Sequence, residues 1–182
     1  MTTSKYEVLR SKEVWEGHIF KIRVDDVRMP SGAIAEREVI SHAGAVGVVP
    51  LTSDRKVILV RQYRHAIGGY LLEIPAGKRD RVEPPAECAK RELKEEAGAD
   101  FSDLFELNEF YNSPGYSSEL FHLYLARVTS IGEMEPDGEE EMEMEREIIP
   151  LQEALGMIDD GQIIDAKTII GLLLTERWLS RG

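Results

Sequence analysis

The chain has 182 residues, of which 42% are hydrophobic and 31% are charged. This length and composition are typical of one globular domain with at most a small appendage, and they exclude two large domains, a disordered chain and a disulfide-framed fold. Because 34 acidic residues oppose 22 basic ones, the formal net charge of −12 would repel a polyphosphate backbone, and we expect no nucleic-acid partner.

The first forty residues predict a small N-terminal β subdomain. Between residues 17 and 40, two alternating segments rich in β-branched residues flank a turn tripeptide at 30–32. This pattern is typical of a β-hairpin.

The rest of the chain predicts a sheet with three helices. Strands are predicted at 45–50, 57–65, 71–76, 105–111, 120–128 and 143–149. The first helix begins at Pro84 and Pro85, because proline is tolerated in a first turn, and it ends at Gly98, a favoured C-cap residue. The other two helices begin at Leu151 and at Asp165, a good N-cap residue.

Cys88 is the only cysteine in the sequence. A single cysteine excludes an intrachain disulfide and a cysteine-based zinc site, and it favours a reducing compartment. The N-terminus lacks the apolar core of a signal peptide, and the longest aliphatic stretch, 169–174, is too short to span a bilayer. We therefore expect a cytoplasmic protein with no membrane partner.

Residues 133–147 carry nine acidic side chains and one basic side chain. This segment is either a solvated acidic loop that runs into a strand or part of a cation site. The sequence of the segment alone leaves both interpretations open.

A second group of carboxylates lies in the helix that ends at Gly98. At about 100° per residue, Glu92, Glu95 and Glu96 fall within an arc of about 100°, beside an apolar stripe that includes Leu93. Carboxylates this close to a buried face repel one another and raise their pKa values unless cations neutralise them, and magnesium or manganese prefers such oxygen ligands. The alternative is a surface helix whose glutamates pair with arginine and lysine.

The spacing of these residues matches that of a known family. Gly77, Glu83 and residues 91–99 fit a Gly, a Glu six positions later and then Arg-Glu-apolar-x-Glu-Glu-x-Gly-apolar, a match with a chance of roughly one in ten million. The chain therefore resembles the Nudix hydrolases. The resemblance implies an α+β protein, namely the Nudix α/β/α sandwich with a mixed sheet, and a magnesium-dependent attack of water on a nucleoside diphosphate linked to another group.

The resemblance also assigns roles within this motif. The implied ligands of Mg²⁺, or of Mn²⁺ in its place, are Glu92, Glu96, Glu95 and the carbonyl of Ala76. Glu95 is also a candidate catalytic residue through its contribution to metals or waters. Arg91 and Glu83 are then mainly structural and hold the loop and the helix in register.

Outside the motif, residues 61–78 and 113–119 resemble the ADP-ribose and nucleoside diphosphate sugar pyrophosphatase branch of the family. Pro114 lies sixteen residues after Gly98, an offset that distinguishes this branch. By this resemblance Arg64 contacts the diphosphate, although it could instead be a surface charge on an edge strand, and Tyr63 is expected in the core. The other implied substrate-binding residues are Glu73, Pro114, Gly115, Ser117 and Glu119.

This branch also carries a catalytic carboxylate in a loop before the last strand, where the acidic run lies. The alternation from Met142 onward is typical of the strand itself, which leaves Glu139, Glu140 and Glu141 as candidates. We favour Glu141, then Glu140, as the group that orients or deprotonates the attacking water.

An N-terminal β subdomain is typical of this branch, in which it resembles an exchanged element that builds a homodimer. The predicted domains are residues 1–41 for this subdomain and 42–182 for the Nudix hydrolase domain. Trp15, His18 and Phe20 then either line a base pocket or pack the hairpin against the main domain.

The leading hypothesis is magnesium-dependent cleavage of ADP-ribose to AMP and ribose 5-phosphate. The nearest alternative is the same chemistry on another nucleoside diphosphate sugar, such as GDP-mannose, because nothing in the sequence identifies the base-binding groups. From other classes, the chain could be a ligand-binding regulator without turnover, or an acidic interaction protein that uses residues 133–147.

Overall fold

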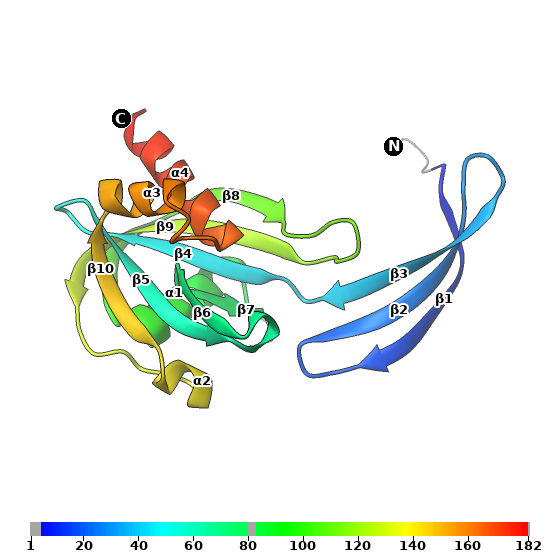
Figure 1. Cartoon of the computed structure of the whole chain (residues 1–182), viewed down its shortest axis with the longest axis horizontal. Helices are drawn as coiled ribbons and strands as arrows, with labels where there is room; N and C mark the ends of the chain where they lie inside the picture. Colours follow the sequence, from blue (N-terminus) through cyan, green and yellow to red (C-terminus); the bar gives the residue numbers. More distant parts are fainter. Residues whose placement is uncertain (1–4, 80–82, 182) are drawn as a thin grey trace. The chain divides into compact units, whose positions relative to one another are not determined.

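The computed structural model describes residues 5–79 and 83–181 (Figure 1). It divides the chain into two compact units, Met1–Gly44 with Tyr111–Leu120 and Ala45–Phe110 with Phe121–Gly182. The predicted domain boundary between residues 41 and 42 stays a prediction. The structure adds to it that the loop around residue 115 groups with the N-terminal unit.

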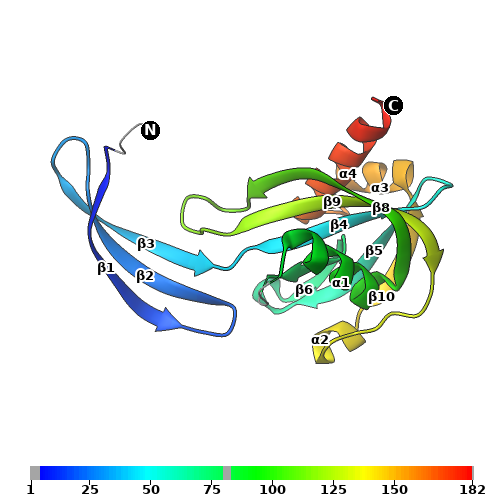
Figure 2. The same ribbon diagram turned by 180° about the vertical axis from the view of Figure 1, so that it is seen from behind.

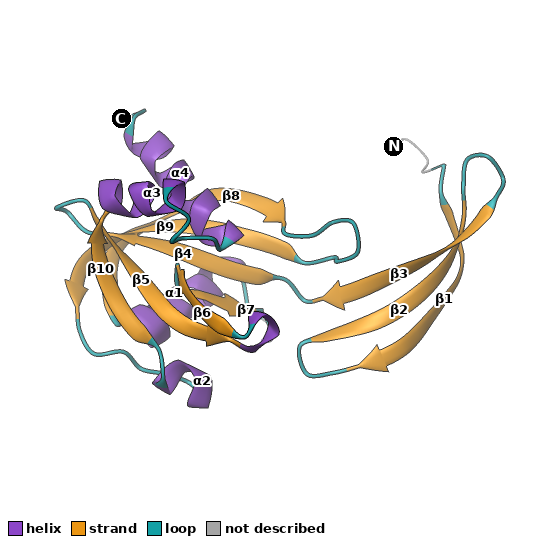
Figure 3. Cartoon of the chain, in the orientation of Figure 1, coloured by secondary structure: helices purple, strands orange, loops and turns teal. Residues whose placement is uncertain are grey.

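An antiparallel sheet forms the first unit, in the order β1 (Glu7–Glu16), β2 (Phe20–Arg28) and β3 (Ile34–His42). The predicted hairpin is confirmed as β2 and β3, which are drawn in Figure 3 as consecutive orange arrows. At its turn the Gly32 N–H donates to the Met29 carbonyl at 2.8 Å, and Gly32 has a φ of 86°, which glycine adopts without strain. Strand β1 is an addition to the predicted hairpin, and all ten of its residues are exposed.

A mixed sheet of seven strands, counted over the described residues, forms the centre of the second unit. Its main path runs through β10 (Glu145–Pro150), β5 (Lys56–Arg64), β4 (Ala45–Leu51), β9 (Leu120–Ile131) and β8 (Ala99–Tyr111), with β6 (Gly69–Glu73) beside β5 and β7 (Ala76–Lys78) beside β4. Strands β4 and β9 are parallel, whereas β5 is antiparallel to β4, β6 and β10. The mixed character that the resemblance implied is therefore confirmed.

Helices cover both faces of this sheet. They are α1 (Pro85–Ala97), α2 (Glu139–Met142), α3 (Leu151–Asp159) and α4 (Ala166–Leu179), with a short 3₁₀ turn η1 (His65–Ile67). Figure 1 shows α3 and α4 on one side of the sheet, and the reverse view in Figure 2 shows α1 on the other. None of the helices in the described part of the chain is long and apolar enough to cross a membrane.

Two hydrophobic clusters explain this three-layer arrangement. Val46 and Val48 of β4 pack with Leu93 of α1, whereas Val49 packs in the cluster that contains Leu172 of α4. Alternate residues of β4 therefore point to opposite faces, so the whole strand is buried and reads as a continuous apolar run. The α/β/α sandwich is confirmed.

The structure corrects four details of the predicted elements. The loop predicted at 139–141 is the short helix α2, and the strand predicted from Met142 onward begins at Glu145. The strand expected at 71–76 is split into β6 and β7, because the chain leaves β5 after Glu73 and the Pro75 carbonyl already accepts from Val48 of β4 at 2.9 Å. Strand β8 begins at Ala99, six residues before the predicted start. Tyr63 was expected in the core but is 49% exposed, because alternation along β5 buries its neighbour Gln62 instead.

Candidate active site

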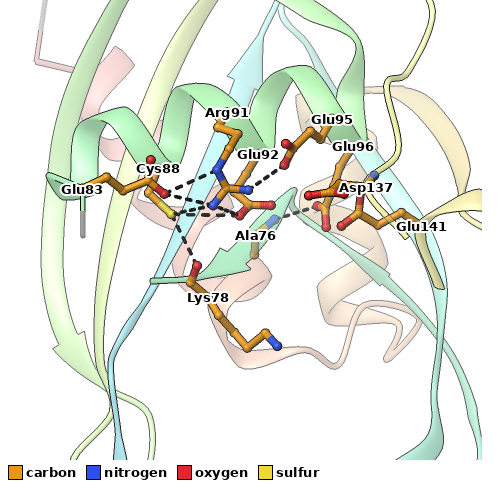
Figure 4. A network of polar contacts seen from close by, with 10 residues as sticks. All are labelled: Ala76, Lys78, Glu83, Cys88, Arg91, Glu92, Glu95, Glu96, Asp137 and Glu141. Carbon is orange, nitrogen blue, oxygen red and sulfur yellow. Dashed lines mark hydrogen bonds and ion pairs between the residues drawn. The ribbon is translucent and has the colours of Figure 1, made fainter. Parts of the chain in front are cut away.

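Three carboxylates from two distant segments of the chain gather at helix α1. Glu92 and Glu96 lie on successive turns of α1, Glu141 lies in α2, and the three offer carboxylate oxygens that lie within 4.8 Å of one another. Figure 4 shows Glu96 and Glu141 pointing toward each other. Glu92 and Glu96 are only 4% and 3% exposed, because they border the apolar stripe that packs α1 on the sheet.

Strand β7 holds the two helical carboxylates from the opposite side. The Ala76 N–H donates to Oε2 of Glu96 at 2.8 Å (Figure 4). Gly77 faces Glu92 so closely that a Cβ on Gly77 would lie 1.9 Å from the Glu92 Cδ atom. Any side chain at Gly77 would therefore displace the Glu92 carboxylate from its position in the cluster.

Burial and mutual repulsion disfavour the charged forms of these carboxylates. Burial raises the pKa of Glu92 to about 7 and that of Glu96 to about 8. These pKa values already include a smaller upward contribution from the charge of Glu141, and opposing ones from Arg91 on Glu92 and from the Ala76 N–H on Glu96.

The donor set fits a hard divalent cation. All three groups are carboxylates, two of them are buried, and the protein supplies too little positive charge to offset their repulsion. Mg²⁺ and Mn²⁺ prefer oxygen ligands of this kind and neutralise such a cluster. The structure shows the Ala76 amide in this cluster, and the metal role predicted for the Ala76 carbonyl stays a prediction.

Arg91 braces the outer side of the same helix. Its guanidinium contacts Glu95 at 2.6 Å, Glu92 at 2.8 Å and Glu83 at 3.1 Å (Figure 4). This arrangement agrees with the structural role that the resemblance implied for Arg91 and Glu83. Glu95 lies outside the three-carboxylate group and pairs with Arg91, and its predicted catalytic and metal roles stay predictions.

Hydrogen bonds connect the acidic segment, residues 133–147, to the C-terminal end of α1. The Glu135 N–H donates to the Glu95 carbonyl at 3.0 Å, and Arg146 donates to the carbonyls of Ala97 and Gly132 at 2.8 and 2.7 Å. Next to α2, the Asp137 N–H donates to Oε2 of Glu141 at 2.7 Å. The segment expected as either a solvated loop or a cation site thus delivers one carboxylate to the cluster.

A second charged cluster connects β5, β6 and α4. Arg64 donates through Nε and Nη2 to the two carboxylate oxygens of Glu73, at 2.8 and 2.6 Å. Glu73 is fully buried, and Lys167 of α4 also contacts its Oε2 atom. Lys167 and Asp165, which contacts it at 3.0 Å, were missed by the sequence reasoning, and the N-cap position of Asp165 was the only local signal near them.

The remaining predicted substrate-binding residues belong to the other compact unit. Pro114, Gly115, Ser117 and Glu119 lie in the first unit, where Ser117 bridges Ile40 of β3. Their substrate-binding roles stay predictions. Trp15 and Phe20 also lie there and pack on each other, with ring centroids 5.2 Å apart. The side chains of Glu139 and Glu140 lie outside the described part of the structure.

Two protein-family models match the chain. The NUDIX domain model matches residues 41–170, which include both charged clusters. The model for the nucleoside diphosphate sugar hydrolase N-terminal domain matches residues 6–40.

Curated proteins and a solved structure are similar over most of the chain. The methanol dehydrogenase activator of Bacillus methanolicus is 36% identical over 91% of this chain and 90% of its own length. The ADP-ribose pyrophosphatase of Mycobacterium tuberculosis is 38% identical over 95% of this chain and 84% of its own. The GDP-mannose pyrophosphatase of Salmonella typhimurium is 35% identical over 74% of each. A crystal structure of an ADP compounds hydrolase, 25% identical, superposes with a TM-score of 0.84 over 100% of this chain and 97% of the other.

Proposed function

The chain belongs to the Nudix hydrolases, and we propose that it hydrolyses the diphosphate of ADP-ribose to AMP and ribose 5-phosphate. The observation that carries the proposal is the group formed by Glu92, Glu96 and Glu141, in which buried carboxylates gather without enough positive charge to balance them. The substrate class is supported by the match of the N-terminal sugar-hydrolase model and by the relatives named ADP-ribose pyrophosphatase.

Glu92 and Glu96 would hold the divalent cation that the reaction needs, which we propose to be Mg²⁺, with Mn²⁺ as a substitute. When bound, the cation polarises phosphoryl oxygens and offsets the negative charge of the transition state. Burial of both glutamates keeps their carboxylates in place, since helix α1 and strand β7 fix them from two sides. Replacing either glutamate would therefore remove a preorganised oxygen ligand.

Glu141 is the proposed general base. It is less buried than Glu92 and Glu96, and it lies on the acidic segment that reaches the cluster from outside α1. In the proposed reaction its carboxylate takes a proton from the attacking water, and the oxygen of that water bonds to one phosphorus. The bond between this phosphorus and the bridging oxygen breaks, and the bridging oxygen leaves on the other phosphate, so that AMP and ribose 5-phosphate each keep one phosphate.

Arg64 is the proposed contact for the diphosphate. Glu73 engages two nitrogens of its guanidinium, while the side chain remains 38% exposed. Because Glu73 is fully buried and its two oxygens already accept hydrogen bonds from Arg64, its proposed part in substrate binding is to orient Arg64. A planar, permanently charged guanidinium suits phosphate oxygens.

A direct assay tests this function. The purified protein is incubated with ADP-ribose and Mg²⁺, and AMP and ribose 5-phosphate are quantified by chromatography. We expect one of each per substrate, and a loss of activity on the order of 10²–10⁴-fold in Glu141→Gln. The matched control is Glu143→Gln, since Glu143 is an exposed glutamate two residues away. Absence of AMP at saturating Mg²⁺ contradicts the proposal.

A second candidate substrate is GDP-mannose, which the similarity to GDP-mannose pyrophosphatases favours. The diphosphate chemistry would be the same, and only the base and the sugar differ. A panel of ADP-ribose, GDP-mannose and UDP-glucose under matched conditions decides by the ratio of kcat/KM values. A higher value for GDP-mannose replaces the first proposal with the second.

A function without turnover is the candidate from another class, favoured by the relative named methanol dehydrogenase activator. A silent regulator needs nucleotide binding but not the charges of the carboxylate cluster. Glu96→Gln would then keep both ligand affinity and the cellular effect. We expect instead that Glu96→Gln abolishes the cellular effect, because the complete carboxylate cluster indicates that this effect depends on turnover.

We propose a cytoplasmic homodimer as the working form. The first unit exposes apolar side chains, including Val8 and Ile34, both about 60% exposed, on a sheet that pairs through three strands only. Such a surface is stabilised when a second copy covers it. Light scattering after size exclusion at several concentrations checks this, and a monomer at every concentration contradicts it.

A further inference from the structure

Four charged side chains of alternating sign form a chain of contacts between the start of α4 and Arg64. Asp165 contacts Lys167 at 3.0 Å, Lys167 contacts Oε2 of Glu73, and Glu73 accepts two hydrogen bonds from Arg64. The Lys167 side chain is 12% exposed, and that of Glu73 is 0% exposed. Glu73 is therefore buried, Lys167 is mostly covered, and Arg64, at 38%, is the most exposed of the four.

Helix α4 fixes the position of Lys167. Asp165 caps the helix by accepting hydrogen bonds from the N–H and the hydroxyl group of Thr168, at 2.9 and 2.6 Å. The Thr168 oxygen in turn accepts from the N–H of Ile74 at 2.8 Å, directly after Glu73 in the chain. The first turn of α4 is thus bonded to the strand end that carries Glu73.

The second cation changes what Arg64 can do. If Arg64 were its only partner, the buried Glu73 carboxylate would pair with the full charge of the guanidinium and leave none of it for a phosphate. Lys167 supplies a further positive charge to the same carboxylate, which leaves the charge of Arg64 available to a phosphate. In agreement, the pKa of Glu73 lies below its usual value, although burial alone would raise it, because Arg64 and Lys167 together outweigh that burial.

Arg64 also lies within electrostatic reach of the carboxylate cluster. Its pKa is raised mainly by the hydrogen bonds to Glu73, and the charge of Glu96 adds to this effect. A diphosphate held over the three carboxylates would therefore lie in the field of Arg64.

We propose that Lys167 is a positioning residue for the substrate diphosphate, acting through Glu73 on the orientation and the available charge of Arg64. This inference rests on the proposed function. It predicts a specific kinetic pattern, because in this proposal Lys167 acts through its contact with Glu73 and not by a contact of its own with the substrate.

The test compares Lys167→Met, Lys167→Arg, Arg64→Gln and the double variant Arg64→Gln/Lys167→Met with the wild type. The matched control is Lys56→Met, since Lys56 forms a more exposed ion pair with Asp54 at 2.8 Å outside the site. For each protein, kcat and KM for ADP-ribose with Mg²⁺ and the melting temperature are measured. The dissociation constant of ADP-ribose without metal is measured by calorimetry as a readout that needs no turnover.

We expect Lys167→Met to raise KM about tenfold or more and to change kcat less than about threefold. Lys167→Arg restores KM to within about threefold, because it returns the charge. In the Arg64→Gln background, Lys167→Met changes KM less than about twofold, since its effect passes through Arg64. If Lys167→Met does not fold, Lys167→Gln, which keeps a donor without the charge, takes its place.

Three results would overturn the inference. The first is a KM of Lys167→Met equal to that of the wild type or of Lys56→Met. The others are a KM of the double variant raised by the product of the two single effects, and a KM of Lys167→Arg as high as that of Lys167→Met. A wild type that binds ADP-ribose but does not cleave it contradicts the proposed function alone, and the dissociation constants then test Lys167. A wild type that does not bind ADP-ribose overturns both.

Discussion

The two charged clusters of the second unit differ in how their buried carboxylates are compensated. Glu73 is fully buried, and two cations contact it, so its pKa lies below the usual value. Glu96 is also buried, but it accepts a single hydrogen bond from Ala76 and faces other carboxylates, so its pKa is raised to about 8. The first arrangement stabilises the fold, whereas the second stores repulsion that a cation relieves.

This difference indicates which buried charge is structural and which is functional. A charge that the fold has already paired holds a neighbour in place. A buried carboxylate that the fold leaves without a positive partner is available to bind a cation, provided that the elements around it hold it in place. Within the carboxylate cluster only Glu92 has such a partner, because Arg91 contacts it at 2.8 Å as well as Glu83 and Glu95, and burial still raises the pKa of Glu92.

The largest expected effect is the loss of activity in Glu96→Gln. The amide removes one negative ligand while it keeps the shape and an acceptor for the Ala76 N–H, so we expect kcat to fall on the order of 10³-fold with little change in fold. Initial rates with ADP-ribose over a range of Mg²⁺ concentrations measure this. Glu87→Gln, on the exposed side of the same helix, is the control, and equal rates for both variants would remove Glu96 from the site.

The next effect is on stability and has opposite signs in the two clusters. Glu73→Gln leaves Arg64 without its carboxylate partner and Lys167 with Asp165 alone, and we expect it to lower the free energy of unfolding by about 3–5 kcal/mol. Glu96→Gln removes an uncompensated charge, and we expect it to raise the melting temperature of the metal-free protein at pH 8. Glu147→Gln breaks the more exposed ion pair with Arg61, 2.7 Å long, and should cost only about 0–1 kcal/mol. Chemical denaturation distinguishes the three, and equal signs for Glu73→Gln and Glu96→Gln would contradict the comparison.

A third effect is the dependence of metal binding on pH. Glu92 and Glu96 have folded-state pKa values of about 7 and about 8, above the ordinary value of 4.5, so the metal-free fold binds more protons than the unfolded chain between these limits. Their contribution to stability is therefore fully present below about pH 4.5 and is lost as the pH rises through 7 and 8.

Because a cation displaces these protons, Mg²⁺ affinity should rise on the order of tenfold between about pH 6 and 8, and Mg²⁺ should raise the melting temperature more at the higher pH. Calorimetric titrations in buffers of different ionisation enthalpy count the protons released. Glu73 has the opposite sign: its lowered pKa stabilises the fold above the ordinary value of 4.5, and this stability is lost as the pH falls through the folded value. A metal affinity independent of pH would contradict the raised pKa values.

The part of the site that the sequence predicts is the part with local periodicity. Glu92 and Glu96 are four residues apart on one helix, so helical geometry alone places them on one face beside Leu93. The strand of continuous apolar residues at β4 and the caps at Gly98 and Asp165 are equally local signals, and the structure confirms them.

The rest depends on contacts between distant segments, which leave no local pattern. Which glutamate of the acidic run meets Glu96 is set by where the segment is bonded to the end of α1, through Glu135 and Arg146. Lys167 meets Glu73 across 94 residues of sequence, and no periodicity in either segment predicts the pair. The division of 71–76 into β6 and β7 likewise follows from a change of partner strand.

The smallest expected effect tests how the acidic cluster is assembled. Gly98 has a φ of 60°, and a Cβ there would lie 2.5 Å from the Glu133 carbonyl oxygen, so Gly98→Ala combines backbone strain with a displacement of the segment that carries Glu141. Gly161→Ala is the matched control, because Gly161 has a φ of 70° with nothing within 4 Å of the added Cβ. Both variants should lose about 1 kcal/mol of stability from the strain. Only Gly98→Ala should also lower kcat, by about threefold to tenfold, since a carboxylate displaced by a few tenths of an ångström is a weaker base for the attacking water. The KM for ADP-ribose should be unchanged in both variants, because the first turn of α4 holds the Arg64 cluster. Equal kcat values for the two variants would show that Glu141 reaches the cluster independently of the end of α1.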